Sequence, residues 1–354
     1  MYYRRQLPIM SGVYRPLETR RFVMMTMGGF WPVIQTLPNG HLGVVTRDGA
    51  FHIGERGRLV FVTSPDGGES WSHAGVISAV GQDNRNPAFG VAADGTLLAA
   101  FIKARYVDGE YDSTTPGEYP LFISRSRDCG ATWTGAEIVQ LPGGGRLEVG
   151  SPFGKMLKLP DGTMLLPYHF GPTTGAAWLI RSRDNGRTWV DPVRIAEGPI
   201  AYTEPALCHL GDGRLLVILR ALHMGQTGLW QSDSADNGYT WSEPRSITGS
   251  DEHPGDVIRL HDGRLLLTYG RRVPPYGIQG LVSHDDGKTW DESNKILLVG
   301  DAGGADTGYP SSIQRDNGAI VTVYYSSVLH VSRRPRPEIL GYHGAAVIYR
   351  PEDL

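Results

Sequence analysis

The amino-acid sequence predicts an all-β fold, a six-bladed β-propeller built from four-stranded antiparallel blades. Two repeated patterns, which alternate along the chain, lead to this prediction. One is an eight-residue motif that occurs five times. The other, an apolar strand followed by a tight turn and a second apolar strand, occurs six times. Repetition of this kind indicates similar units that pack side by side in series.

The eight-residue motif has the form Ser-x-Asp-x-Gly-x-Ser/Thr-Trp. Its five copies begin at Ser64, Ser126, Ser182, Ser234 and Ser283. The Asp side chain accepts hydrogen bonds from backbone amides just ahead of it, and Gly takes a positive φ, so both favour a tight turn. The Trp buries a large apolar area beneath that turn. We therefore interpret the motif as a structural staple between two strands rather than as a catalytic element.

The second repeat is a β-hairpin, because two apolar runs around Asp-Gly or Asn-Gly are a strong hairpin signal. The six turns are Asn39-Gly40, Asp94-Gly95, Asp161-Gly162, Asp212-Gly213, Asp262-Gly263 and Asn317-Gly318. Six hairpins predict six blades. The sixth blade has no eight-residue motif because the chain ends after its third strand, so we expect residues 21–27 to supply the fourth strand and close the ring. No linker or change in composition divides residues 1–354, which predicts one domain.

Composition and charge argue against several classes of function. The net charge is −3, so no basic field is expected to attract nucleic acid, and no stretch approaches the roughly 20 apolar residues of a membrane span. Cys129 and Cys208 lie far apart and predict free thiols. The spacing of Cys and His suggests no metal site, and we expect no cofactor. The N-terminal residues do not read as a leader, which indicates a cytoplasmic protein, or a secreted or periplasmic one whose leader has been removed.

Candidate site residues lie where the first strand of each blade begins and the second strand ends, because these positions meet at one mouth of the central channel. Arg47, Arg220 and Arg271 end the second strand in three different blades, and Arg272 follows the last of them. The guanidinium fork matches carboxylate, sulfate and phosphate groups, so this arrangement predicts a site for an anion. Further candidates for substrate binding at equivalent places are Trp31, Arg85 and His169.

The eight-residue motif resembles the Asp-box of sialidases, and the resemblance covers essentially the whole chain as a fold. In the fourth blade, Glu204 and Arg220 are similar to the sialidase glutamate that partners the nucleophile and an arginine that binds the substrate carboxylate. In the sixth blade, Gly308-Tyr309-Pro310-Ser311-Ser312 is similar to the segment that carries the sialidase tyrosine nucleophile. The resemblance implies that Glu204 takes the proton of Tyr309, which then attacks the anomeric carbon. Arg271 or Arg272 would be a second carboxylate-binding arginine.

Two positions differ from the sialidase pattern. Phe30-Trp31-Pro32 stands where sialidases usually have Arg-Ile-Pro, so the first arginine is absent there and Arg47 is the candidate to replace it. His52 occupies the place of the acid/base aspartate, with Asp48 and Glu55 nearby. Because histidine exchanges protons at neutral pH, His52 and Asp48 are both candidates for the general acid. Trp31 is equally compatible with core packing and with stacking on a sugar ring.

These observations predict a sialidase-like exo-glycosidase that removes a terminal, anionic sugar from a glycan or oligosaccharide. Two alternatives remain open. One is an oligosaccharide lyase that cleaves a uronate by β-elimination, with arginine neutralising the carboxylate. The other is a non-catalytic glycan-binding propeller. Release of a saturated sugar, formation of an ultraviolet-absorbing product, or binding without turnover would distinguish the three.

Overall fold

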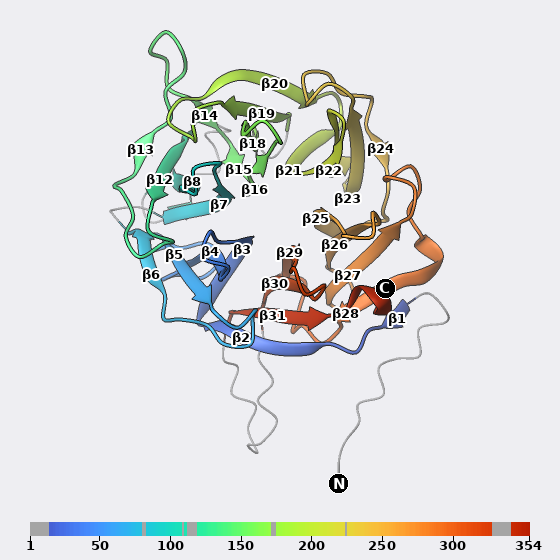
Figure 1. The fold of residues 1–354 in the computed structure, drawn as a ribbon. Helices are drawn as coiled ribbons and strands as arrows, with labels where there is room; N and C mark the ends of the chain where they lie inside the picture. Colours follow the sequence, from blue (N-terminus) through green and yellow to red (C-terminus); the bar gives the residue numbers. More distant parts are fainter. Residues whose placement is uncertain are drawn as a thin grey trace.

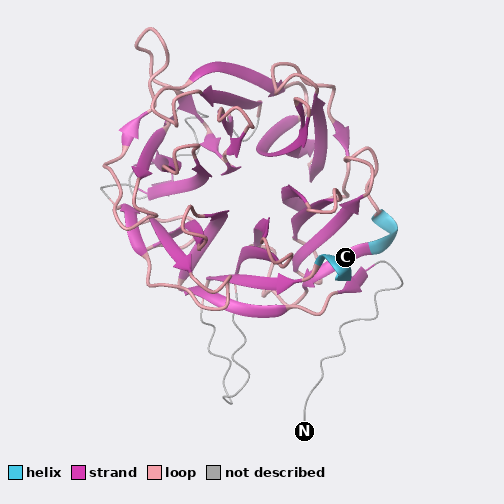
Figure 2. Cartoon of the chain, in the orientation of Figure 1, coloured by secondary structure: helices cyan, strands magenta, loops and turns pink. Residues whose placement is uncertain are grey.

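The computed structural model describes residues 14–79, 83–107, 110–111, 119–170, 175–223, 225–327 and 341–354. Six main sheets follow one another around a central channel as the blades of a propeller (Figure 1). Nearly all regular structure is strand (Figure 2), and the helical turns are η1 (Glu292–Asn294) and η2 (Pro351–Asp353). The predicted all-β, six-bladed propeller is therefore confirmed.

Each blade places one strand at each of four positions from the channel outward. The first strands are β3 (Gly28–Thr36), β7 (Asp83–Val91), β15 to β17 (Ser151–Pro152, Gly154–Lys155 and Leu157–Lys158), β21 (Ala201–Gly211), β25 (Glu252–Arg259) and β29 (Gly308–Gln314). The second strands are β4 (Leu42–Asp48), β8 (Leu97–Ala104), β18 (Met164–His169), β22 (Arg214–His223), β26 (Leu265–Arg271) and β30 (Ile320–Ser326).

The outer half of each blade carries the third and fourth strands. The third strands are β5 (Arg58–Ser64), β12 (Phe122–Ser126), β19 (Ala177–Ser182), β23 (Gln226–Ser234), β27 (Gly277–Ser283) and β31 (His343–Tyr349). The fourth strands are β6 (Gly75–Ser78), β13 (Glu137–Ile138), β20 (Val190–Ala196), β24 (Arg245–Ser246), β28 (Lys295–Val299) and β2 (Arg20–Thr26). The short strands outside this scheme are β1 (Tyr14–Pro16), β9 (Tyr106–Val107), β10 (Glu110–Tyr111), β11 (Tyr119–Pro120) and β14 (Glu148–Val149).

Both ends of the described chain meet in the last blade. Strand β2 pairs antiparallel with β31 and completes the sheet β2-β31-β30-β29, at the place where the sequence analysis puts the closing strand (Figure 1). Behind it, Ile34 and Val44 of the first blade pack against Val321 and Val323 of the last. Strand β1 adds to the outer edge of the neighbouring blade by pairing parallel with β28. Hydrogen bonds and apolar packing thus both join the ends of the ring.

The eight-residue motifs form turns between the third and fourth strands. In the fourth motif, the Asp236 carboxylate accepts hydrogen bonds from the amide of Thr240 at 2.9 Å and from its hydroxyl at 2.6 Å. The hydroxyl of Ser234 donates to Asp236 at 2.8 Å and accepts the amide of Gly238 at 2.9 Å. The other four motifs repeat this pattern. Their geometry is that of the structural staple predicted from sequence.

The third blade departs from the regular first strand that its hairpin pattern predicts. Its first strand is broken into three short pieces, and the piece β16 pairs parallel with β7 of the second blade. The interruptions fall at Phe153 and Met156, and Gly154, which begins the middle piece, has a φ of 61° outside the extended region. The inner edges of the second and third blades are therefore joined by backbone hydrogen bonds as well as by side chains.

Findings on membrane spans, metal ligands and cysteines apply to the described ranges only. Within them, no helix is long and apolar enough to cross a membrane. In the same part of the chain, no group of three or more His, Cys, Asp or Glu side chains could hold a metal ion. Both Cys129 and Cys208 are free thiols.

Candidate active site

A backbone feature repeated around the channel directs side chains to one point. In four blades, the residue before the first-strand proline has a positive φ, and these residues are Trp31 (50°), Asn86 (51°), Glu204 (49°) and Tyr309 (51°). Each lies at a register shift between the first and second strands. All four line the same small cavity at the channel mouth. Positive φ is uncommon outside glycine and concentrates at functional sites, so this ring marks the candidate site.

Tyr309 and Glu204 meet across this mouth from the sixth and fourth blades. The Tyr309 hydroxyl donates a hydrogen bond to Oε1 of Glu204. Burial raises the pKa of Tyr309 and the adjacent carboxylate raises it further, so the phenol keeps its proton at rest. Burial also opposes ionisation of Glu204, but Arg220 and the hydrogen bond from Tyr309 hold the pKa of Glu204 below its usual value. The pair is thus a protonated phenol beside an ionised carboxylate.

His169 supports Glu204 from the third blade. The backbone amide of Glu204 donates to Nδ1 of His169 at 3.2 Å. Burial lowers the pKa of His169 to about 4, so the ring is neutral near pH 7 and Nδ1 can accept this bond. His169, predicted as a substrate-binding residue, is therefore placed to hold the strained backbone at Glu204.

Two of the predicted arginines reach the pair. Arg220 donates to Oε2 of Glu204 at 3.2 Å, and its side chain is 31% exposed, so it is open to a ligand. The guanidinium carbon of Arg272 lies 5.7 Å from the centroid of the Tyr309 ring, and its Nε donates to the carbonyl oxygen of His253 at 3.3 Å. Burial, together with these two arginines, lowers the pKa of His253 to about 2, so His253 adds no charge here.

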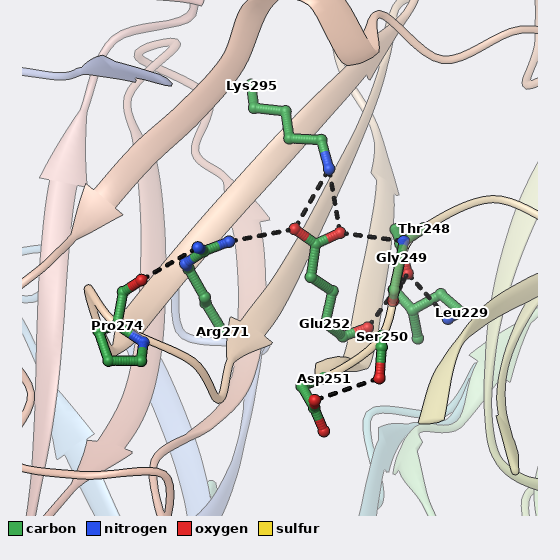
Figure 3. Close-up of polar contacts among 9 residues, drawn as sticks. All are labelled: Leu229, Thr248, Gly249, Ser250, Asp251, Glu252, Arg271, Pro274 and Lys295. Atoms are coloured by element: carbon green, nitrogen blue, oxygen red, sulfur yellow. Dashed lines mark hydrogen bonds and ion pairs between the residues drawn. The ribbon is translucent and has the colours of Figure 1, made fainter. Parts of the chain in front are cut away.

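Arg271 belongs to a different environment. Its guanidinium lies 3.4 Å from Oε1 of Glu252, which also accepts from Lys295, whose Nζ lies 3.0 Å from Oε2 (Figure 3). Arg271 further donates to the carbonyl oxygen of Pro274 at 3.1 Å. All three charged side chains of this cluster are buried, with the side chain of Arg271 only 8% exposed. The structure thus places Arg271 in an internal ion cluster of the fifth blade and Arg272 beside Tyr309.

The guanidinium of Arg47 is also taken up by contacts within the protein. Its side chain is fully buried, and its Nε donates to Asp83 at 2.7 Å. The same guanidinium donates to the carbonyl oxygens of Phe51 at 2.6 Å and Gly54 at 3.2 Å. Arg47 therefore holds the loop after β4 in place, which leaves no free donors to replace the missing first arginine. Arg85, predicted for substrate binding, is buried as well and lies 3.2 Å from Asp83.

Trp31 and His52 form part of an aromatic cluster next to Tyr309. Trp31 is 4% exposed, and its ring packs edge to face against His52, with centroids 5.1 Å apart, and against Tyr309 at 6.3 Å. Of the two roles that the sequence leaves open for Trp31, this geometry corresponds to packing. The other acid/base candidates have different surroundings. Asp48 is bound to Arg58 through two hydrogen bonds of 2.7 and 2.9 Å, and Glu55 is exposed on the loop.

The sequence analysis missed one carboxylate at the site, Asp306, in the loop before β29. Its Oδ1 lies 3.0 Å from Nδ1 of His52 and accepts the hydroxyl of Tyr325 at 2.6 Å. A signal was available, since Asp306 stands three residues before Tyr309, but a single aspartate in a glycine-rich loop is common. Only the fold brings it to His52, which is distant in sequence.

The chain resembles a curated sialidase. It is 25% identical over 309 residues to a sialidase from Bacteroides fragilis, and the match covers 76% of this chain and 54% of that protein. The chain therefore spans about half the length of this curated relative.

Solved structures share the fold. A Dyadobacter fermentans protein of unknown function superimposes with a TM-score of 0.76 at 23% identity, covering 93% of this chain and 98% of that one. A Hadza microbial sialidase gives 0.71 at 20% identity, covering 93% and 67%. The intramolecular trans-sialidase from Ruminococcus gnavus, in complex with oseltamivir carboxylate, gives 0.64 at 15% identity, covering 91% and 94%.

A family model of the BNR repeat-like domain matches residues 63–322, a span that contains all five eight-residue motifs. The repeats, the propeller and this match agree, and the chain belongs to the BNR repeat-like domain family.

Proposed function

We propose that this protein is a sialidase-type retaining exo-glycosidase that removes a terminal, anionic sugar from a glycan. The observation that carries the proposal is the contact between the Tyr309 hydroxyl and the Glu204 carboxylate, with Arg220 on the other oxygen of that carboxylate. A phenol is a weak nucleophile until a base takes its proton, and an ionised carboxylate within hydrogen-bond distance is such a base. Tyrosine nucleophiles are a known exception among glycosidases.

In the first step, the phenolic oxygen of Tyr309 forms a bond to the anomeric carbon while Glu204 takes the phenolic proton. The bond from the anomeric carbon to the leaving oxygen breaks, and that oxygen receives a proton from a general acid. His52 is the acid we assign, because it lies beside Trp31 and its side chain is 35% exposed. In the second step, His52 takes a proton from a water molecule as the water oxygen bonds to the anomeric carbon. The bond from that carbon to the phenolic oxygen of Tyr309 breaks, and Glu204 returns the phenolic proton to Tyr309.

The acidic group of the sugar would bind to Arg220 and Arg272. Arg220 is partly exposed beside Glu204, and Arg272 lies against the Tyr309 ring, so an anion between them would sit next to the nucleophile. A bidentate guanidinium contact gives both affinity and orientation to a carboxylate. Two arginines form this proposed clamp, since a buried Phe30 stands at the position of the usual first arginine.

The test is a panel of aryl glycosides that includes sialic acids, uronic acids and arabinofuranosides, followed by product analysis. We expect release of a free saturated sugar from an acidic glycoside. An ultraviolet-absorbing product would instead indicate elimination, and binding without turnover would indicate a glycan-binding propeller.

Trapping the intermediate tests the nucleophile directly. A glycosyl fluoride with a second fluorine next to the anomeric carbon should accumulate as a covalent adduct, because the second fluorine slows both steps while the good fluoride leaving group keeps the first step faster than the second. Mass spectrometry of the digested protein should locate the sugar on the peptide that contains Tyr309. A label on the peptide that contains Glu204 would show that the carboxylate is the nucleophile.

A further inference from the structure

Asp306 lies at the centre of a hydrogen-bonded group that joins two loops at the channel mouth. Its carboxylate accepts from Nδ1 of His52, with distances of 3.0 and 3.2 Å to the two oxygens. It also accepts the hydroxyl of Tyr325 at 2.6 Å and the hydroxyl of Tyr342. Three donors from three separate segments therefore converge on one carboxylate.

These donors keep Asp306 ionised. Burial alone would raise the pKa of Asp306, but the hydrogen bonds from His52, Tyr325 and Tyr342 hold it well below the usual range. Burial raises the pKa of Tyr325 and Tyr342, so both phenols remain donors. An ionised carboxylate only accepts hydrogen bonds, so the histidine nitrogen that faces it must carry a proton.

This contact fixes how His52 presents its ring. With Nδ1 bound to Asp306, exchange of a proton with a ligand is left to Nε2, which has no hydrogen-bond partner among the described residues. The imidazole ring of His52 packs edge to face against Phe30, with centroids 5.9 Å apart, and against Trp31, with centroids 5.1 Å apart. His52 therefore has one nitrogen bound to the protein and one available to a ligand.

The loop that carries His52 is held from its other side. Besides the bonds from Arg47 to the carbonyl oxygens of Phe51 and Gly54, the amide of Gly54 donates to the hydroxyl of Tyr106 at 2.7 Å. That hydroxyl donates to Asp83 at 2.8 Å, and Asp83 also binds Arg47. A buried network thus limits the movement of the loop, so His52 can be held at a defined place relative to Tyr309.

We propose that Asp306 is the positioning residue that makes His52 the acid and base of the reaction, an inference that rests on the proposed function. In the first step, imidazolium at His52 gives its Nε2 proton to the leaving oxygen as the bond to the anomeric carbon breaks. The Nδ1 proton stays on His52, donated to Asp306, in both steps, and the Asp306 carboxylate balances the positive charge of the imidazolium. In the second step, neutral Nε2 takes a proton from the attacking water and restores the imidazolium.

The experiment compares Asp306→Asn with wild type on two substrates that share a sugar and differ in leaving group. A poor leaving group, the alcohol of a natural glycan, needs a proton, whereas 4-nitrophenolate leaves without one. We expect kcat/KM of Asp306→Asn to fall about 100-fold on the glycan and less than about 5-fold on the nitrophenyl glycoside. Asp306→Glu should recover part of the loss on the glycan.

Asp301→Asn is the matched control, because Asp301 lies in the same loop and its carboxylate pairs with Arg21 at 2.9 Å on the surface. It should match wild type on both substrates. Nitrogen-15 spectra of His52 give a readout apart from turnover, with a protonated Nδ1 in wild type and an altered signal in Asp306→Asn.

The outcomes separate the two proposals. Equal losses on both substrates, or an unchanged His52 spectrum in Asp306→Asn, would overturn the role of Asp306 while the glycosidase activity of wild type stood. Absence of turnover by wild type on every glycoside of the panel would overturn the proposed function and the role of Asp306 with it.

Discussion

Arg271 and Arg272 are neighbours in the chain, but their guanidinium groups contact different parts of the molecule. Arg271 closes the buried cluster with Glu252 and Lys295, whereas Arg272 lies 5.7 Å from the ring of Tyr309. Successive residues of an extended chain point to opposite faces, which accounts for the difference. One arginine thus serves the stability of the blade and the other faces the candidate active site.

Arg272→Met and Arg271→Met should therefore have different effects. Loss of Arg272 should raise KM for an acidic glycoside by about 10- to 100-fold, because a charged hydrogen bond to the sugar is removed. Loss of Arg271 should lower the free energy of unfolding by about 3 kcal/mol, since the buried Glu252 loses one of its two cationic partners and keeps Lys295. Steady-state kinetics and urea unfolding on both variants measure this. A higher KM in Arg271→Met with unchanged stability would reverse the assignment.

Tyr309→Phe should fold normally and lose turnover by about 1000-fold or more, because the nucleophilic oxygen is removed with little change in volume. Glu204→Gln should be comparably damaging, since an amide does not take the phenolic proton. Circular dichroism serves as the folding control, and His169→Gln, which keeps a possible acceptor for the Glu204 amide, should have a smaller effect. Near wild-type turnover by folded Tyr309→Phe would exclude the tyrosine mechanism.

Trp241→Ala should lower stability by about 3 kcal/mol without a selective loss of turnover. The ring is partly buried against the core between the third and fourth blades, and its Nε1 donates to the carbonyl oxygen of Gly238 at 3.2 Å. Asp236→Ala, which removes the acceptor of the same turn, should act in the same direction. Thermal unfolding and kinetics are compared below the lower melting temperature. Unchanged melting with lost activity would contradict the purely structural role of the motif.

Stability should fall in acid because of the motif aspartates. Hydrogen bonds from Thr132 lower the pKa of Asp128 to about 2, and the backbone and side-chain bonds from Thr289 lower the pKa of Asp285 to about 2. Since an aspartate in the unfolded chain has a pKa of about 3.9, these carboxylates favour the folded state above about pH 4 and lose that effect as pH falls towards 2. Urea unfolding at pH values from 7 to 2 measures this loss of stability.

Asp285→Asn isolates one of these groups. Its difference in stability from wild type should be largest at pH 7 and shrink as pH approaches 2, because the wild-type carboxylate is then protonated. A difference that stayed constant across this range would show that the charge of Asp285 contributes nothing.

The fold was predictable because its signals are local. The Asp-Gly turns and the eight-residue motifs need only residues close in sequence, and counting them gives the number of blades. The pair of Tyr309 and Glu204 was implied by the resemblance to sialidases, with each residue at the start of a first strand. Arg47 could not be placed this way, because its burial depends on Asp83 in the next blade and on carbonyl groups of a loop. Asp306 was missed because its partner His52 approaches it only when the ring closes.

The bulge before the first-strand proline of four blades has a consequence for how this scaffold can change its chemistry. Its positive φ accompanies a shift in strand register and is shared by residues as different as Trp31, Asn86, Glu204 and Tyr309. We therefore expect exchange of one unbranched side chain for another at such a position to leave the backbone path unchanged. Valine, isoleucine and threonine are disfavoured there, because β-branched side chains tolerate a positive φ poorly. Substitution at these positions of the channel mouth can therefore change the chemistry of the site while the fold stays the same.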